Sequence, residues 1–325
     1  MRNPISLYRQ RAYDKMDALE RQLLNMSDII TGDERSRERG QVTVDEHFMQ
    51  SLPLSEKLYM VTNVLPSLRR CIKSQKESVD SLSRNPAQPE TAADPAFILA
   101  LEDRARSLGV AAIGYAKLPR SLIFKNKGVL YENAIVVTME MDRERMGKAP
   151  SLQALDNVIK TYEDLGDIVN RLAAFLRENG YGAQASPALG GLAFYPELAV
   201  GACMGVRGRH GLLISPGHGP RQRIAAVFTS IANLPFASGN PHEWVRDFCR
   251  RCGRCIKKCP AGAIFEKPEE LAGGAVRMVD PGRCLKYFES HYGCSVCIKE
   301  CPFNVTGYET IKSAFDRMRR AADQR

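Results

Sequence analysis

The sequence has no apolar run approaching the ~18–20 residues that a membrane-spanning helix requires, which excludes a protein built on transmembrane helices. No apolar segment of the secretory type follows the early basic residues, and the pair Arg69-Arg70 leads into a mostly polar segment. Ten cysteines in 325 residues are too few for a disulfide scaffold. We therefore expect a cytoplasmic protein whose thiols are reduced.

The composition is that of a folded chain with an uneven charge. A hydrophobic content of 44% excludes a disordered or collagen-like chain, and 325 residues predict two domains, with one or three allowed. Residues 1–95 carry 14 positive and 14 negative side chains, so the net charge of +9 arises from the remainder. Part of it lies among the cysteines, where it would stabilise anionic clusters, dock an acidic electron donor, or simply be solvated. These cations are Arg250, Arg251, Arg254, Lys257 and Lys258.

Changes in composition predict three parts. Residues 1–93 are expected to form a helical extension, with a helix over 52–68 that ends near Pro66 and a polar linker over 74–95. Residues 94–240 form the expected core, and residues 241–325 form the expected cluster-bearing domain.

The core region mixes helix and strand patterns irregularly, which predicts an α+β (mixed α/β) fold. Apolar residues at helical spacing over 155–176 mark a long amphipathic helix, followed by Gly180 as a C-terminal cap. Apolar runs predict strands over 110–116, 134–139 and 224–231.

Eight of the ten cysteines fall in two short runs. The first run is Cys249-x2-Cys252-x2-Cys255-x3-Cys259-Pro260. The second run is Cys284-x9-Cys294-x2-Cys297-x3-Cys301-Pro302. The first run has the spacing of bacterial ferredoxins, in which the fourth Cys binds the other cluster. Eight thiolates in two such runs predict two [4Fe–4S] clusters.

Exchange of the fourth ligands assigns each thiolate to a cluster. One cluster would be held by Cys249, Cys252, Cys255 and Cys301. The other would be held by Cys259, Cys284, Cys294 and Cys297. The alternative is zinc, but zinc sites usually combine two separated C-x2-C pairs, which three cysteines at x2 spacing before Cys-Pro do not resemble.

A second candidate site is the glycine-rich block over residues 196–223. Glycine lets the backbone approach a large flat cofactor closely. On spacing alone, a turn without a ligand is the simpler interpretation, since the block does not match the phosphate-binding Gly-x-Gly-x-x-Gly. The candidate cofactor-binding residues are Gly201, Gly205, Gly208, Arg209, His210, Gly211, Leu212 and Ser215.

Three segments, in their order along the chain, resemble the cobalamin-dependent reductive dehalogenase family and its relative, epoxyqueuosine reductase. They are FLRENGYGA at 175–183, the glycine-rich block extended over 198–236, and the dicluster module ending in GCSVCIKECPFN at 293–304. YENAIVVTMEMD at 131–142 also resembles a dehalogenase core strand. The resemblance covers about residues 95–306.

This resemblance implies a nitroreductase-like core that binds a corrinoid (cobalamin), followed by a dicluster ferredoxin-like domain that passes electrons to cobalt. Cob(I)alamin would then drive reductive cleavage of a carbon–halogen or carbon–oxygen bond. The dehalogenases pair a Tyr general acid with a Lys or Arg, and Tyr162 and Arg209 stand near these positions. A cation beside a phenol stabilises the phenolate that remains after proton transfer. The plain alternatives are a core Tyr bonded through its hydroxyl, and an Arg that is exposed or binds a cofactor carboxamide.

Two other functions are left open. An epoxyqueuosine-reductase-like enzyme acting on tRNA agrees with the basic charge, but the segment 185–191 lacks the catalytic Asp that those enzymes carry. A non-catalytic electron-transfer protein is the third interpretation. The expected partners are a low-potential electron donor of the ferredoxin or flavodoxin type and a small-molecule substrate, and a homodimer is left open.

Overall fold

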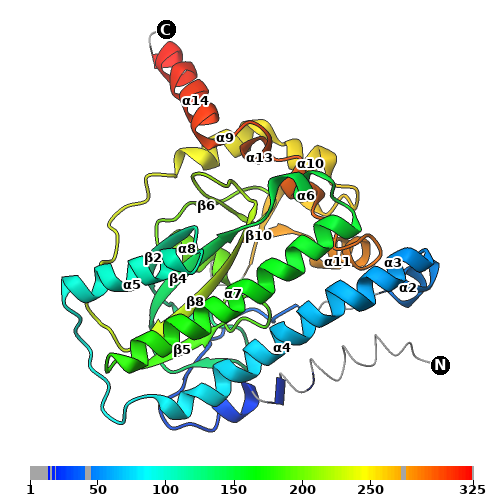
Figure 1. The fold of residues 1–325 in the computed structure, drawn as a ribbon. Coiled ribbons are helices and arrows are strands. Elements are labelled where there is room, and N and C mark those ends of the chain that lie inside the picture. The colour runs from blue at the N-terminus through cyan, green and yellow to red at the C-terminus, as the bar shows by residue number, and fades with distance from the viewer. Residues whose placement is uncertain (1–13, 15–16, 19, 41–44, 272–275, 324–325) are drawn as a thin grey trace.

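The computed structural model describes residues 14, 17–18, 20–40, 45–271 and 276–323. A four-stranded antiparallel sheet in the order β2–β4–β8–β5 lies at its centre. Its strands are β2 (Ala112–Lys117), β4 (Asn133–Glu140), β8 (Gln222–Thr229) and β5 (Ala183–Ser186). Figure 1 shows the long helix α7 (Leu152–Glu178) running across this sheet, and α8 (Tyr195–Gly201) packs on the opposite face. The predicted α+β fold is confirmed.

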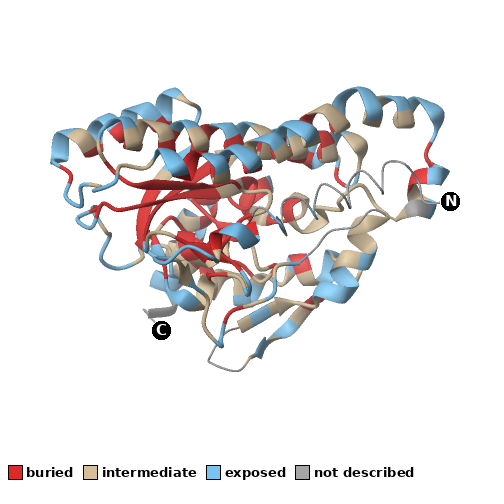
Figure 2. Ribbon diagram, turned by 90° about the horizontal axis from the view of Figure 1, so that it is seen from below, coloured by how far each residue is buried: buried red, intermediate tan, exposed pale blue. Residues whose placement is uncertain are grey.

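Both faces of the sheet are buried (Figure 2). In β4, Ile135 and Val137 join the core beneath α7, whereas Ala134 and Val136 join the core beneath α8. Successive side chains of a strand point to opposite faces, so a strand buried on both sides is a continuous apolar run. This is the pattern from which the strands were predicted, and Phe228 of β8 is likewise fully buried.

The helices of the core have the caps that their sequences indicate. The Asp94 side chain accepts a hydrogen bond from the Phe97 N–H at 2.7 Å and begins α5 (Pro95–Ser107). Ser151 begins α7 in the same way, and the chain leaves α7 through Gly180 at φ +86°. The predicted long helix and its glycine end are confirmed.

The N-terminal extension is helical, but the predicted helix end near Pro66 is wrong. A π-helical turn (Met60–Val64) joins α3 (Leu54–Tyr59) to α4 (Leu65–Asp80). Pro66 lies in the first turn of α4, where a missing N–H costs little. The predicted linker start at Ser74 is also wrong, because α4 continues through it and Asn170 of α7 donates to the Ser74 carbonyl at 2.9 Å.

The remaining elements are short. They are β1 (Ile30–Thr31), α2 (Glu46–Ser51), a 3₁₀ turn (Ser81–Arg84), a second 3₁₀ turn (Arg120–Leu122), β3 (Gly128–Val129), α6 (Arg143–Gly147), β6 (Val206–Arg207) and β7 (Leu213–Ile214). The cysteine-rich part contains α9 (Trp244–Cys252), α10 (Arg254–Lys258), β9 (Ile264–Glu270), β10 (Val276–Val279), α11 (Pro281–Glu289), α12 (Val296–Lys299), α13 (Pro302–Val305) and α14 (Tyr308–Asp323). Among the described residues, no helix is both long and apolar enough to cross a bilayer.

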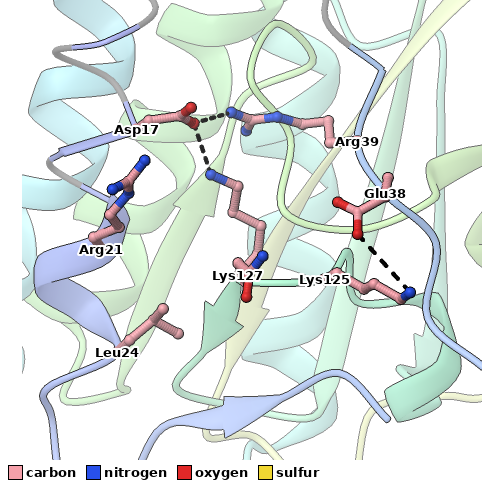
Figure 3. Close-up of a pocket in the computed structure, with 8 residues that line it drawn as sticks. Asp17, Arg21, Leu24, Glu38, Arg39, Lys125 and Lys127 are labelled. Carbon is pink, nitrogen blue, oxygen red and sulfur yellow. Dashed lines mark hydrogen bonds and ion pairs between the residues drawn. The ribbon is translucent and has the colours of Figure 1, made fainter. Parts of the chain in front are cut away.

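A cluster of buried ion pairs fixes the segment before α2 to the core. Asp17 pairs with Arg39 and Lys127, each at 2.8 Å, as Figure 3 shows. Glu20, which is 1% exposed, pairs with the same two cations. Arg39 also donates to the carbonyl oxygen of Gly190 at 2.9 Å. The extension is thereby tied to the loop that precedes α8.

We expect the Glu20→Gln variant to lose about 3 kcal/mol of unfolding free energy, because it leaves two buried cations with one carboxylate fewer. Urea unfolding followed by circular dichroism measures the loss. Glu34 is exposed, so Glu34→Gln is the matched control and is expected to change stability by less than about 0.5 kcal/mol. Equal losses in the two variants would contradict the assigned role of the buried network.

Candidate functional site

One group of thiols gathers where α9, α10 and α13 begin or end. Burial, together with the neighbouring Cys249 and Cys255, raises the pKa of the Cys301 thiol. The nearby Cys252 likewise raises the pKa of the Cys249 and Cys255 thiols. Cys301 therefore lies with three cysteines of the first run, although it ends the second run.

The second group is built in the same manner. Burial is the largest cause of the raised pKa of Cys297, and Cys294, Cys284 and Cys259 also raise it. Cys259 thus lies with three cysteines of the second run. The structure brings the eight sulfurs together in the two sets that an exchange of fourth ligands requires, while their ligand roles stay a prediction.

The donor set suits iron–sulfur clusters. Burial raises the pKa of Cys249 to about 12 and that of Cys255 to about 11, so thiolates at these positions require a cation, which cluster iron supplies. Backbone N–H groups also point at sulfurs, as in the 3.3 Å bond from Ala263 to Cys259. Across the part of the chain that the structure describes, no three His, Cys, Asp or Glu side chains are grouped closely enough for a metal ion.

The glycine-rich block forms a hairpin of β6 and β7 that packs against its own chain. A Cβ at Gly205 would lie 2.2 Å from the Ile214 carbonyl oxygen, and one at Gly208 would lie 2.6 Å from the Ile214 side chain. Gly211 turns the hairpin at φ +79° towards Met278. Gly205 and Gly208 therefore serve close packing of the protein, and Gly211 serves the turn. A Cβ at Gly201 would meet only Ala116, at 3.8 Å.

The tip of the hairpin carries Arg209 to the first group of thiols, and His210 follows it in the chain. Burial raises the pKa of the Cys249 thiol, while a hydrogen bond from the Arg209 backbone N–H and the charge of the Arg209 guanidinium lower it. The guanidinium also donates to the carbonyl oxygen of Phe265 at 3.1 Å. His210 is buried, which lowers its pKa to about 4, and its Nδ1 accepts from the Leu212 N–H at 3.2 Å. The neutral imidazole therefore carries its proton on Nε2, which has no protein partner.

A different arginine stands beside Tyr162. The guanidinium of Arg223, at the start of β8, lies 4.7 Å from the centroid of the Tyr162 ring, and Tyr162 lies on α7. Sequence analysis paired Tyr162 with Arg209, which instead contacts the cysteine-rich part, and it missed Arg223. A detectable signal was present, since a cation at the edge of a buried apolar strand requires a partner.

Tyr162 and Arg223 line a cavity of about 130 Å³. The other walls come from the loop before α8, from α8 itself, from the hairpin and from β8. They are Ala188, Tyr195, Pro196, Leu212, Leu213, Pro220, Gln222 and Ile224. The cavity is smaller than the ~300–1,000 Å³ of most ligand sites, but it shares their mainly apolar lining with a few polar groups.

Buried polar atoms without protein partners belong to two residues that line the cavity, Gln222 and Arg223, and to two at the tip of the hairpin, Arg209 and His210. They are Gln222 Oε1, Arg223 Nε, Arg209 Nε and His210 Nε2. The Gln222 amide nitrogen is used up in holding Ser215, to whose hydroxyl it donates at 2.7 Å. Such unpaired donors and acceptors are costly unless a ligand satisfies them, and the amide side chains of a corrinoid offer both kinds of partner. The fit to a corrinoid rests on these atoms, because the cavity beside Tyr162 is smaller than the whole group.

The second group of thiols adjoins the cavity. Cys297, Tyr162 and Leu212 all pack against one buried apolar cluster that contains Val158 and Ile298. The two groups of thiols are themselves neighbours, since Cys255 acts on the pKa of Cys297. Thiols and cavity therefore form one continuous site.

Comparison with known proteins agrees with this geometry. Residues 248–305 match the family model of the 4Fe-4S dicluster domain. The chain is 33% identical over 210 residues to a tetrachloroethene reductive dehalogenase of Desulfitobacterium hafniense, a match that covers 60% of this chain and 37% of that protein. The corresponding enzyme of Sulfurospirillum multivorans is 31% identical over 201 residues, covering 58% of this chain and 39% of that protein. An epoxyqueuosine reductase of Cyclobacterium marinum is 26% identical over 125 residues, covering 33% of this chain and 36% of that enzyme.

The fold is that of the reductive dehalogenases. A solved reductive dehalogenase, whose structure was described as suggesting a mechanism for B12-dependent dehalogenation, superposes with a TM-score of 0.64 at 20% identity, covering 85% of this chain and 43% of that one. The predicted resemblance to reductive dehalogenases is thereby confirmed, including the ferredoxin-like part with its 4Fe–4S dicluster domain. The chain spans about 37% of the length of the curated relatives that it matches first.

Proposed function

We propose that this chain carries the catalytic and iron–sulfur parts of a corrinoid-dependent reductase of the reductive dehalogenase type. Its substrate is a small molecule with a carbon–halogen bond or another cleavable carbon–heteroatom bond. The observation that carries the proposal is the continuity of the site, in which two sets of four thiols adjoin a small cavity that contains a Tyr–Arg pair.

The reaction consumes two electrons and one proton for each bond cleaved. The carbon–halogen bond breaks, a carbon–hydrogen bond forms, and the halide leaves. The two sets of thiolates would hold two [4Fe–4S] clusters, which would supply these electrons one at a time. Cys255 of the first set and Cys297 of the second are neighbours, so the two sets lie side by side. The apolar side chains around Cys297 exclude water from this region.

Tyr162 provides the proton. Its phenol borders the cavity, and the Arg223 cation over its ring stabilises the phenolate that remains after transfer. Water re-protonates the phenolate between turnovers. Gln222 and Arg223 present unpaired polar atoms that orient the bound molecules.

A corrinoid, when bound, would supply the low-valent cobalt centre that reductive cleavage requires. Gln222, Arg223 and His210 would hold it through their unpaired atoms. His210 acts there as a neutral hydrogen-bond donor, since burial lowers its pKa to about 4.

The tRNA-modifying alternative has less support from the site. The segment that would match the Asp-bearing stretch of epoxyqueuosine reductases contains Ser186 instead. Its hydroxyl lies 2.6 Å from the hydroxyl of Tyr195, and both groups are buried. No acid lies in residues 185–191.

Anaerobic reconstitution with iron, sulfide and hydroxocobalamin tests the proposal. We expect about eight irons and one cobalt per chain, with halide released from tetrachloroethene or 3-bromo-4-hydroxybenzoic acid under titanium(III) citrate. A chain that keeps its iron but retains no cobalt would contradict the corrinoid and leave the electron-transfer interpretation.

A further inference from the structure

One face of the cysteine-rich part is strongly basic. Residues 244–258 carry six Arg or Lys and one Asp. Eight exposed cations of α9, α10 and α14 are called the basic face here. They are Arg250, Arg251, Arg254, Lys257, Lys258, Arg317, Arg319 and Arg320.

The two parts of the basic face form one surface. Arg251 of α9 donates to the sulfur of Met318 at 3.7 Å, and its guanidinium lies 5.8 Å from the ring centroid of Phe315. Figure 1 shows α9, α10 and the base of α14 at the same end of the molecule. Segments that are about 60 residues apart in the sequence therefore present their charges together.

Much of this charge is not neutralised by the protein. Arg250 pairs with Asp247, and Arg254 pairs with Glu300 at 3.0 Å. Within the described residues, no carboxylate lies at ion-pair distance from Lys257 or Lys258. An ordinary solvated surface mixes both signs of charge, whereas this face offers a net positive field.

The basic face lies over the first group of thiols. Helix α9 carries Cys249 and Cys252, and α10 carries Cys255 between Arg254 and Lys257. The second group, by contrast, is the one that adjoins the Tyr162 cavity. Electrons that enter at the basic face therefore meet the two groups in order before they reach the cavity.

The aromatic side chains near this face are not available for stacking on bases. Trp244, Phe248, Phe303 and Phe315 pack on one another, with ring centroids 5.1 to 6.3 Å apart. Single-stranded nucleic acid is bound by exposed aromatic rings combined with positive charge, and here only the charge is exposed. The face favours a folded acidic partner.

We propose that the basic face is the docking surface for an acidic ferredoxin, which delivers one electron per encounter to the cluster held by Cys249, Cys252, Cys255 and Cys301. The proposal rests on the proposed function, since it assumes that this cluster is present. Two successive encounters oxidise two reduced ferredoxins and supply the two electrons that one bond cleavage consumes. Complementary charge raises the rate of encounter by about 10–10³-fold at low ionic strength.

The test is the rate at which a reduced acidic plant-type ferredoxin bleaches the reconstituted full chain in anaerobic stopped-flow experiments. We expect Lys257→Glu/Lys258→Glu to slow this step at least about 10-fold at low salt and to flatten its dependence on ionic strength. Reduction by titanium(III) citrate is expected to be unchanged. Arg104→Glu/Lys117→Glu reverses the same charge at exposed positions of α5 and β2 and is expected to behave as wild type.

Equal rates for the two double variants would overturn the proposal, as would tighter binding of duplex DNA than of ferredoxin at the same ionic strength. Iron and sulfide contents of each variant show that the clusters are intact. The assay reads cluster reduction alone, so failure of the corrinoid chemistry leaves it unaffected. Failure of docking would conversely leave turnover with titanium(III) citrate intact.

Discussion

Replacing Tyr162 by Phe is expected to lower kcat for dehalogenation by about 10²–10⁴-fold, while iron, sulfide and cobalt contents stay unchanged. Phe keeps the ring that Arg223 covers at 4.7 Å and removes only the O–H group. The loss therefore measures proton delivery and not packing. Halide release under titanium(III) citrate, which bypasses any protein donor, is the appropriate assay.

Two further variants locate the acid and its partner. Tyr181 lies in the core beneath α7, away from the cavity, so Tyr181→Phe is expected to retain wild-type turnover. Arg223→Leu is expected to cost about 10²-fold in kcat, because it removes the cation that stabilises the phenolate. If Tyr162→Phe turned over at the wild-type rate, the proton would have to come from another group. A large loss in Arg209→Leu with none in Arg223→Leu would restore the pairing expected from the sequence.

Replacing Cys259 by Ala is expected to remove about four of the eight irons. The cluster lost should be the one shared with Cys284, Cys294 and Cys297, although Cys259 follows the first run in the sequence. Iron content alone does not reveal which cluster is lost, so the prediction needs pairs of variants.

Pairs of variants make the assignment, because two losses add only when the sites are independent. Cys259→Ala/Cys297→Ala should lose no more iron than either single variant, since both residues would hold one cluster. Cys259→Ala/Cys255→Ala should lose nearly all of it. The reverse pattern would show that each run keeps its own fourth ligand. EPR of the reduced proteins provides a second measure of the cluster that remains.

The elements predicted correctly are those whose pattern is local and strong. Strands β4 and β8 are apolar throughout because both faces are buried, and α7 repeats its apolar face over seven turns. Strand β5 was missed because its sequence Ala-Gln-Ala-Ser has no β-branched residue, and it is a strand only through its pairing with β8. The linker prediction failed because α4 is polar on its outer face and is held by α7, a contact between distant segments.

In the candidate site, too, local sequence patterns were predictable and contacts between distant segments were not. Cysteine spacing predicts sets of thiols because eight residues at fixed intervals leave few alternatives, and the structure gathers these sets. The partner of Tyr162 depends on how α7 crosses β8, which spacing does not encode. The glycines of the hairpin left two interpretations open, a turn without a ligand and a surface for a cofactor. Steric fit to Ile214 supports the first at Gly205 and Gly208, and the role of the block in cofactor binding stays a prediction. The division into residues 1–93, 94–240 and 241–325 stays a prediction.

The hairpin of β6 and β7 makes the cysteine-rich part depend on the rest of the chain for its packing. Its residues Val206 and Ile214, which precede the cysteine-rich part in the chain, share an apolar core with Phe303, Tyr308 and Ile311. A cut at residue 240 would separate Val206 and Ile214 from the rest of that core and expose apolar surface on both fragments to water. We therefore expect a ferredoxin module transplanted from another protein to fold on this scaffold only if its matching hairpin is transplanted with it.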